Sequence, residues 1–340
     1  MLEVKGLKVR IHSDKGVVKA VNGVSFTIKA GQTVGIVGES GSGKSVLAQS
    51  LMRLNPEPTT VYTEGEILFL DRNILALTDK EVRQLRGSDI AMIFQDPMSS
   101  LNPVFKIGDQ LIDAIRAKQK MSRKTAKQKA TELLKDVGIS DPDRRMGEYP
   151  HQFSGGMRQR VLIAMALASK PKLLIADEPT TALDVTIQAQ ILQLLKNIQN
   201  KYGMAIIIIT HDLGVVANMA DNILVMYSGR IVEEGSTEDI FYRTTMPYTW
   251  SLLRALPRLD ANDQEQLVTI KGNPPNLLGE MKGCSFYQRC PFATEQCALS
   301  DPVLREIGKD HRVACILSES EFIDQVNQLQ SIQQKEVVYE

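Results

Sequence analysis

Apolar and polar residues alternate along residues 1–30, as in Leu2-Glu-Val-Lys5 and Val24-Ser-Phe-Thr-Ile28. A period of two places successive side chains on opposite faces of a strand, so this pattern predicts half-buried antiparallel strands. Residues 33–37 predict a further strand that runs into a glycine-rich turn. A helix is predicted at 46–54 and another strand at 65–70.

The pattern of apolar and polar residues changes in the middle of the chain. Residues 96–154 read as polar helical segments, whereas residues 173–176 and 205–209 are fully apolar runs bounded by polar residues. Such runs are typical of parallel strands that are buried on both faces. Between them, apolar residues recur at helical spacing: Ile187, Ile191, Leu194, Leu195 and Ile198. Strand, helix and strand in this order predict a βαβ unit and a parallel sheet.

The pattern weakens toward the C-terminus. Residues 223–226 and 231–233 surround Ser228-Gly229 and predict a hairpin, but prolines punctuate the chain after Leu256. We therefore place a domain boundary near residues 255–267, with one domain at 1–255 and an extension at 256–340. A last helix is predicted from apolar residues at helical spacing: Phe322, Ile323, Val326 and Leu329.

Composition and charge argue against several classes of protein. The chain has 340 residues with 40 basic and 40 acidic side chains, so its net charge gives no global bias toward nucleic acid or an anionic membrane. The most apolar stretches, 161–168 and 205–209, are far shorter than the roughly 20 residues of a spanning helix. The N-terminus carries charges where a signal peptide needs an apolar run. We expect a cytoplasmic protein that reaches a membrane only through a partner.

The glycine-rich turn matches the phosphate-loop pattern of glycine, four residues, glycine, lysine and a hydroxyl. Glycines let backbone N–H groups approach phosphate oxygens, the lysine reaches the β and γ phosphates, and the hydroxyl ligates Mg²⁺. The alternative is a chance match in an ordinary turn, but the motif stands between a strand and a helix, as it must. The predicted ATP-binding residues are Gly38, Glu39, Ser40, Gly41, Ser42, Gly43, Lys44 and Ser45.

A second candidate feature is the apolar strand that ends in Asp177-Glu178. Alone, such an end is as often a solvated loop start. Beside a phosphate loop, Asp177 is a candidate ligand of Mg²⁺ and Glu178 a candidate general base for the attacking water. Repulsion between the two carboxylates is expected to raise the pKa of at least one of them, which suits a base.

Further motifs carry a resemblance to the ATP-binding subunits of ABC transporters. Phe153-Ser154-Gly155-Gly156 resembles the signature motif, Thr181-Ala-Leu-Asp184 the D-loop, Gln95 the Q-loop glutamine and His211 the switch histidine. Together with the phosphate loop and the acidic strand end, they stand in the order of that family. A lone Gln or His is more often a satisfied polar residue, but the ordered set makes coincidence remote.

The resemblance implies an α/β fold: a P-loop NTPase with a RecA-like parallel sheet core, an N-terminal antiparallel β-subdomain and a helical subdomain at about 96–158. It implies an ATPase in which Gln95 contacts Mg²⁺ or the attacking water and His211 contacts the γ-phosphate. Ser154, Gly155, Gly156 and Asp184 are implied to meet the ATP held by a second subunit. The family usually has an aromatic residue that stacks on adenine, but residues 9–16 contain none; Ile11 and His12 are the candidates there.

Within that family the chain resembles the dipeptide, oligopeptide and nickel class of permease ATPases. The resemblance lies in Asp96-Pro-Met-Ser-Ser-Leu-Asn-Pro103, in Met157 after the signature glycines, and in the extension with Gly272-Asn-Pro-Pro-Asn276. It implies an ATPase at the cytoplasmic face of the membrane, two membrane permease subunits, a sister ATPase or a second copy, and an extracellular peptide-binding protein.

Two alternative functions stay open at this point. The first is import of nickel or another small solute by the same permease class. The second is a soluble ABC ATPase that acts on DNA or ribosomes. Such proteins carry two ATPase units, long coiled coils or zinc modules, whereas this chain has one unit and no long heptad insertion. No nucleic-acid partner is therefore expected.

All the cysteines stand in the extension, at positions 284, 290, 297 and 315, separated by five, six and seventeen residues. Four cysteines in a reducing compartment indicate zinc or an iron–sulfur cluster, and unligated thiols are the remaining alternative. The spacing lacks the tight pairs usual for structural zinc. Some relatives with this extension carry a [4Fe–4S] cluster, so the resemblance implies that Cys284, Cys290, Cys297 and Cys315 are its ligands.

Residues 116–129 carry seven basic side chains and no acidic one. We interpret this run as a solvated helical surface. Contact with anionic lipid or with nucleic acid is the functional alternative.

Overall fold

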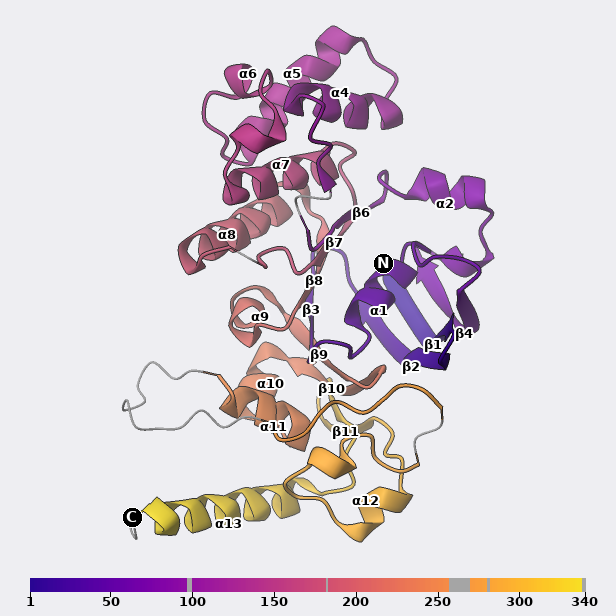
Figure 1. Ribbon diagram of the computed structural model, residues 1–340, viewed down its shortest axis with the longest axis vertical. Coiled ribbons are helices and arrows are strands. Elements are labelled where there is room, and N and C mark those ends of the chain that lie inside the picture. The colour runs from indigo at the N-terminus through magenta and orange to yellow at the C-terminus, as the bar shows by residue number, and fades with distance from the viewer. Residues whose placement is uncertain (97–99, 182, 257–269, 280–281, 338–340) are drawn as a thin grey trace.

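The computed structural model describes residues 1–96, 100–181, 183–256, 270–279 and 282–337. Two sheets organise the fold (Figure 1). The smaller sheet is antiparallel and has the order β2-β1-β4-β5. Its strands are β1 (Leu2–Ser13), β2 (Gly16–Ile28), β4 (Thr60–Phe69) and β5 (Arg72–Asn73). The predicted antiparallel β region at the N-terminus is thereby confirmed.

The larger sheet has a parallel centre with an antiparallel extension. Its parallel strands lie in the order β9 (Asn222–Tyr227), β3 (Thr33–Val37), β8 (Ala205–Thr210), β7 (Leu173–Asp177) and β6 (Ile90–Ile93). Beside β9 follow the antiparallel strands β10 (Arg230–Ser236), β12 (His311–Val313) and β11 (Arg305–Gly308). The strands predicted at 33–37, 173–176 and 205–209 and the hairpin around Ser228-Gly229 are confirmed.

The parallel strands are almost entirely apolar, with polar residues only at their ends, because both of their faces are buried. Leu174, Ile206 and Ile208 belong to the core on one face of the sheet, whereas Leu173 and Ile207 belong to the core on the other. The first core is shared with α7 (Gly155–Leu167), α8 (Val185–Tyr202) and α9 (Leu213–Met219). The second includes the small sheet and α1 (Lys44–Ser50).

The helical segment lies at one end of the long axis of the molecule (Figure 1). It contains α4 (Ile107–Lys118), α5 (Arg123–Asp136), α6 (Pro142–Arg145) and the short helix η2 (Pro150–Gln152). Nearer the small sheet, η1 (Ile74–Ala76) and α2 (Asp79–Leu85) precede β6. The basic run does not form a single helix. It spans the end of α4 and the start of α5, which Ser122 caps by accepting a hydrogen bond from Thr125 N–H at 3.1 Å.

The extension lies at the opposite end of the molecule, beyond α10 (Thr237–Tyr242) and α11 (Pro247–Arg254) (Figure 1). It contains η3 (Tyr287–Arg289), α12 (Glu295–Leu299) and α13 (Glu319–Val337). Phe322 of α13 packs with Phe292 and Trp250. Most of the predicted boundary at 255–267 lies outside the described residues. Because β12 pairs with β10, the extension continues the large sheet.

The predicted helix at 46–54 is wrong at both ends, since α1 covers Lys44–Ser50. It starts earlier because Gly43 takes a φ of 102° and turns the loop directly into the helix. It ends earlier because Arg53 takes a φ of 49°, which turns the chain out of the helix, and Leu54 N–H donates back to Gln49 O at 2.9 Å. No helix in the described ranges has the length and apolar composition needed to span a membrane.

Candidate functional site

Residues 38–45 connect the end of β3 to α1, the context that a phosphate loop requires. Gly38 has a φ of 149° and Gly43 one of 102°. A Cβ atom would lie 2.1 Å from Met226 O at Gly38 and 2.2 Å from Ala20 O at Gly43. Only glycine fits at these two positions. The sequence therefore dictates a tight loop that can present backbone N–H groups to an anion.

Lys44 lies inside this loop and is only 6% exposed. Its Nζ donates to the carbonyl oxygens of Gly38 at 2.7 Å and Glu39 at 2.9 Å. Burial lowers the pKa of Lys44, and the nearby carboxylates of Glu178 and Asp177 oppose this effect. The ammonium group is thus held within the loop by two carbonyl oxygens, at a position where phosphate oxygens bound by the loop can contact it.

Two of the three predicted protein ligands of Mg²⁺, Ser45 and Asp177, lie in contact with each other, and the third, Gln95, bonds the neighbouring Glu178. Ser45 Oγ donates to Asp177 Oδ1 at 3.2 Å, although 132 residues separate them in the chain. Asp177 ends β7 and is 4% exposed. A hydroxyl and a carboxylate beside a phosphate loop form a donor set that suits Mg²⁺, because this ion prefers oxygen ligands and is shared with substrate phosphates.

Glu178 follows Asp177 and is the point where several side chains converge. Its Oε2 accepts hydrogen bonds from Gln95 Nε2 and from Thr181 Oγ1, both at 2.8 Å. Its Oε1 lies 3.2 Å from Nδ1 of His211. The backbone is turned by a φ of 49°, with the N–H of Glu178 donating to Ile209 O at 2.8 Å. The carboxylate is therefore fixed from three sides while the His211 side chain stays 63% exposed.

Sheet topology explains why these distant residues meet. Lys44 follows β3, His211 follows β8, Glu178 follows β7 and Gln95 follows β6. Those four strands are adjacent and parallel, so their carboxyl ends share one edge of the sheet. Ligand sites of open α/β sheets form outside such an edge. The structure thus brings the predicted phosphate-binding, magnesium-binding and catalytic residues together.

The expectation for the carboxylate pair needs a correction. The pKa of Asp177 is raised, first by burial and only then by the charge of Glu178. The pKa of Glu178 is lowered: burial acts to raise it, but hydrogen bonds from Thr181 and His211 and the charges of His211 and Lys44 outweigh burial. The raised pKa therefore falls on the candidate metal ligand and not on the candidate base. The surroundings of Glu178 therefore favour its ionised form, and they weaken its affinity for a proton compared with an ordinary glutamate.

The signature residues form a second group. Ser154 caps α7 by accepting a hydrogen bond from Met157 N–H at 3.4 Å, and Gly155 and Gly156 are the first residues of the helix. A Cβ atom at Gly156 would lie 2.7 Å from Ile187 Cγ2 of α8. Asp184 caps that helix by accepting from Ile187 N–H at 2.9 Å. Signature and D-loop residues therefore adjoin each other; residue 182 of the D-loop and residues 97–99 after the Q-loop lie outside the described residues.

Two sets of contacts were not predicted from the sequence. Thr181 stands three residues after Glu178, a spacing at which a hydroxyl can reach back across a turn, so it could have been found. Arg289 of η3 pairs with Glu39 of the phosphate loop, and Tyr248 of α11 accepts a hydrogen bond from Glu39 N–H at 2.9 Å. No local pattern reveals these contacts, because they span 250 and 209 residues.

The four cysteines line one largely enclosed cavity at the opposite end of the molecule from the helical segment, together with Phe286 and Phe292. Backbone N–H groups two residues further along the chain point at three of the sulfur atoms, from Phe286, Phe292 and Leu317. Burial raises the pKa of Cys290 to about 12. No three His, Cys, Asp or Glu side chains in the described ranges converge closely enough to hold a single metal ion.

Comparison with sequence families gives two matches. The family described as ABC transporter matches residues 21–181. The family described as the C-terminal region of oligopeptide and dipeptide transporters matches residues 232–297. The first match covers the phosphate loop, the signature and the acidic strand end, and the second includes three of the four cysteines.

Several curated proteins are similar to this chain over most of their own length. The oligopeptide transport ATP-binding protein OppD of Haemophilus influenzae is 52% identical over 322 residues, which are 95% of this chain and 98% of the relative. OppD of Bacillus subtilis is 50% identical over 92% of this chain and 87% of its own. The dipeptide transport ATP-binding protein DppD of B. subtilis is 51% identical over 94% of this chain and 95% of its own.

Among solved structures, an ATP-binding cassette captured as a dimer in a post-hydrolysis state with ADP and Pi is similar, with a TM-score of 0.63 and 30% identity. The match covers 70% of this chain and 99% of that one. The structure of cbiO1 from Clostridium perfringens, part of the ABC transporter complex cbiONQ, gives a TM-score of 0.60 at 30% identity, and the match covers 71% of this chain and 90% of that one. The shared part is therefore the ATPase core.

Proposed function

Because this chain belongs to the family of ABC transporter ATP-binding proteins of the oligopeptide and dipeptide type, we propose that it hydrolyses ATP to energise peptide import through a membrane permease. One observation carries this proposal: Lys44, Asp177, Glu178 and His211 meet at the carboxyl edge of three adjacent parallel strands, β3, β8 and β7. An ATPase needs a phosphate cradle, a metal site and a base within reach of one another, and this edge provides all three.

Each residue has a proposed role in the reaction. The loop at 38–45 cradles the phosphates, and Lys44 neutralises charge on the β and γ phosphates. Ser45, Asp177 and Gln95 hold Mg²⁺, which supplies electrostatic stabilisation of the phosphates when bound. Glu178 accepts a proton from the attacking water, and its low pKa keeps it ionised for this task. His211, hydrogen-bonded to Glu178, contacts the γ-phosphate and keeps the base oriented.

The second group of residues is proposed to act across a dimer. Ser154, Gly155 and Gly156 begin a 13-residue helix whose free N–H groups form an anion site. The phosphate loop of one subunit would hold the γ-phosphate, and the start of this helix in the other subunit would complete the binding site, with Asp184 beside it. Thr181 connects the two groups, because it lies in the D-loop and bonds Glu178. ATP thereby joins two subunits, and hydrolysis releases them.

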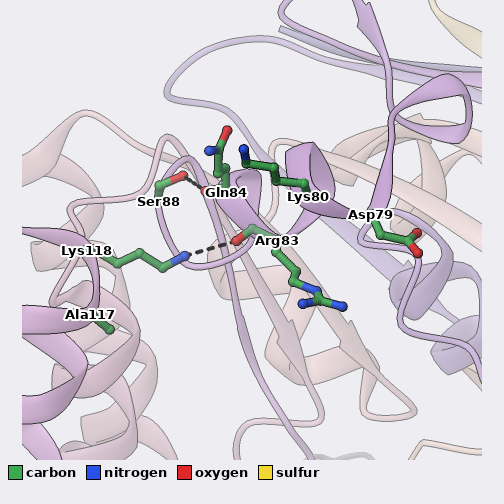
Figure 2. Close-up of a pocket in the computed structure, with 7 residues that line it drawn as sticks. All are labelled: Asp79, Lys80, Arg83, Gln84, Ser88, Ala117 and Lys118. Carbon is green, nitrogen blue, oxygen red and sulfur yellow. Dashed lines mark hydrogen bonds between the residues drawn. The ribbon is translucent and has the colours of Figure 1, made fainter.

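Docking of the permease is proposed at the groove between the ATPase core and the helical segment. Figure 2 shows part of it: a cavity with a volume of about 630 Å³ is lined by residues of α2, such as Arg83, and by Ala117 and Lys118 of α4. Lys118 Nζ donates to Arg83 O at 3.1 Å across it. Near the Q-loop, Phe94, Val104 and Phe105 are 43%, 72% and 54% exposed. Exposed apolar side chains rimmed by polar ones favour a protein partner.

The assembly follows the same reasoning. We propose two permease subunits, a sister ATPase in preference to a second copy, and an extracellular peptide-binding protein that contacts only the permease. The ATPase would then sit peripherally at the cytoplasmic face of the membrane. ATP-dependent pull-down from native membranes tests this: permease subunits and one related ATPase should accompany the protein. Ribosomes or DNA in their place would contradict the transport function.

We propose that the cysteine cavity holds a [4Fe–4S] cluster; zinc, the alternative, would need the cysteines to move closer to one another, because no three of them converge on a single point in the described residues. Four thiols around a shared cavity match a cluster, in which each iron takes one thiolate, and N–H groups aimed at sulfur atoms tune such centres. Cys284, Cys290, Cys297 and Cys315 would be the ligands, and the cluster would supply a structural crosslink.

Elemental analysis tests the cluster. Anaerobically purified protein should contain about four iron atoms and four acid-labile sulfides per chain, and a Cys297→Ser variant should contain less of both. A Ser285→Ala variant, which changes a neighbouring residue without a thiol, serves as the control. Zinc at one atom per chain, or no metal at all, would refute the cluster.

A further inference from the structure

The phosphate loop is tied to the C-terminal extension by a buried ion pair. Arg289 donates through Nη1 to Glu39 Oε2 at 2.5 Å and through Nη2 to Glu39 Oε1 at 2.8 Å. The Arg289 side chain is 5% exposed and that of Glu39 is 25% exposed. Two parallel charge-assisted hydrogen bonds fix both distance and orientation, which a single ammonium group does not. Glu39 is the second residue of the loop that we propose binds ATP.

The arginine itself is held rigidly. Its Nε donates to Lys271 O at 3.1 Å, and its Nη1 also donates to Tyr227 Oη at 3.2 Å. Tyr227 forms an aromatic cluster with Tyr248 and Phe286, with ring centroids 4.5 and 5.3 Å from that of Tyr227. These contacts hold the guanidinium in place independently of the loop. Little conformational entropy is therefore lost when it forms its two parallel hydrogen bonds to Glu39, an arrangement that we call the fork.

The loop is held by its backbone as well. Glu39 N–H donates to Tyr248 Oη at 2.9 Å, and Tyr248 is fully buried. The backbone carbonyl oxygen of Glu39 accepts a hydrogen bond from Lys44 Nζ at 2.9 Å. Glu39 thus connects the extension on one side to the phosphate-binding lysine on the other. A change in the position of Arg289 moves the residue whose carbonyl positions Lys44.

We propose that Arg289 is a positioning residue for nucleotide binding: its fork on Glu39 holds the phosphate loop in the shape that accepts MgATP. The inference rests on the proposed ATP binding by this loop. Because Arg289 directly precedes Cys290, the folding of the cysteine cavity and the affinity for ATP become linked. Linkage is reciprocal, so bound MgATP stabilises residues 284–297 in turn.

The test compares MgATP affinity among full-length variants. Arg289→Gln removes the fork, and the dissociation constant for MgATP should rise about tenfold, equivalent to about 1.4 kcal/mol. Arg289→Lys keeps the charge but not the fork and should give an intermediate rise. Glu39→Gln should match Arg289→Gln, and the double variant should be no worse than either, because both remove the same interaction.

Asp301→Asn is the matched control. Asp301 accepts from Arg230 Nη1 at 2.8 and 2.7 Å, so it also links the extension to the core, but through a residue of β10 and not through a residue of the phosphate loop. Its MgATP affinity should equal that of the original chain. If Arg289 had a purely structural role, Arg289→Gln would resemble Asp301→Asn: the melting temperature would fall, and the affinity for MgATP would not fall selectively.

Hydrogen exchange gives a second readout. MgATP should slow exchange across residues 284–297 in the original chain and leave it unchanged in Arg289→Gln. If Arg289→Gln does not fold, Glu39→Gln decides, since it leaves the extension intact. An affinity within twofold of the original in Glu39→Gln would overturn the inference. By contrast, a Lys44→Ala variant that binds MgATP as well as the original chain would overturn the proposed ATP site itself.

Discussion

At the scale of single residues, the site is organised around one carboxylate. Glu178 receives hydrogen bonds from Gln95, Thr181 and His211, which come from three different loops. A general base must be ionised and must be oriented toward the water that it activates. The lowered pKa of Glu178 meets the first requirement, and the converging donors meet the second.

Replacing Glu178 with Gln should therefore lower ATP turnover about 10²- to 10⁴-fold, because an amide cannot accept the proton. MgATP binding should persist, since Lys44, Ser45 and Asp177 remain in place. Steady-state hydrolysis and gel filtration with MgATP check this, and the variant should accumulate as an ATP-bound dimer. Unchanged hydrolysis would show that another group acts as the base.

Thr181 offers a finer test of the same carboxylate. Thr181→Val removes the hydroxyl that donates to Glu178 at 2.8 Å, whereas Thr181→Ser keeps it. A hydrogen bond to a charged group contributes roughly 1.5–3 kcal/mol, so we expect kcat to fall about tenfold or more in the valine variant. The Michaelis constant of the valine variant for ATP should be close to that of the original chain. The serine variant should be close to the original chain in kcat. Equal rates for valine and threonine would contradict the role of Thr181.

Motif residues could be predicted from the sequence because their chemistry is encoded in short stretches. Gly38 and Gly43 are required by backbone geometry, and a carboxylate pair after a buried strand reaches the same sheet edge. Arg289 could not be predicted in this way. Its partner lies 250 residues away, and an arginine beside a cysteine carries no local signal of an ion pair.

At the scale of elements, hydrophobic pattern predicted what was buried on both faces. The parallel strands β3, β7 and β8 stand out because every position is buried and nearly all are apolar, and the alternation of the N-terminal strands follows from one buried face. Helix ends were less predictable. The C-terminal end of α1 depends on Arg53, whose φ of 49° ends the helix although its residue type gives no local signal of a stop. The joining of β12 to β10 has no periodic signal at all, since β12 is three residues long.

The β10–β12 junction is held by a buried polar contact that can be tested. His311 Nε2 lies 2.9 Å from Glu233 Oε1, and Thr244 Oγ1 donates to Glu233 Oε2 at 2.8 Å. Glu233 is fully buried, so His311→Ala would leave a carboxylate oxygen without this partner. The free energy of unfolding should fall by about 1–3 kcal/mol. Urea denaturation measures this, with the exposed His12→Ala as the control; equal stability of the two variants would contradict it.

At the scale of the whole molecule, the sites are spread along one long axis (Figure 1). The helical segment lies at one end, the extension with α12 and α13 lies at the other, and the parallel strands β3, β7 and β8 lie between them. The Q-loop residue Gln95 bonds Glu178 and is followed by the exposed Val104 and Phe105. A permease seated at the helical end would therefore act on Gln95, and through it on the base.

This arrangement predicts that docking and catalysis can be separated by substitution at the surface. Phe105 is 54% exposed, so Phe105→Asp should leave stability and MgATP binding of the isolated chain close to the original. At an interface, however, an aromatic anchor contributes 2 kcal/mol or more, and a buried unpaired carboxylate adds a further penalty. Recovery of permease subunits from native membranes should fall more than tenfold. Tyr242→Asp, at an 84% exposed tyrosine of α10, is the matched control and should leave recovery unchanged. Equal loss in both variants would indicate a general surface effect, and no loss in Phe105→Asp would place the permease elsewhere.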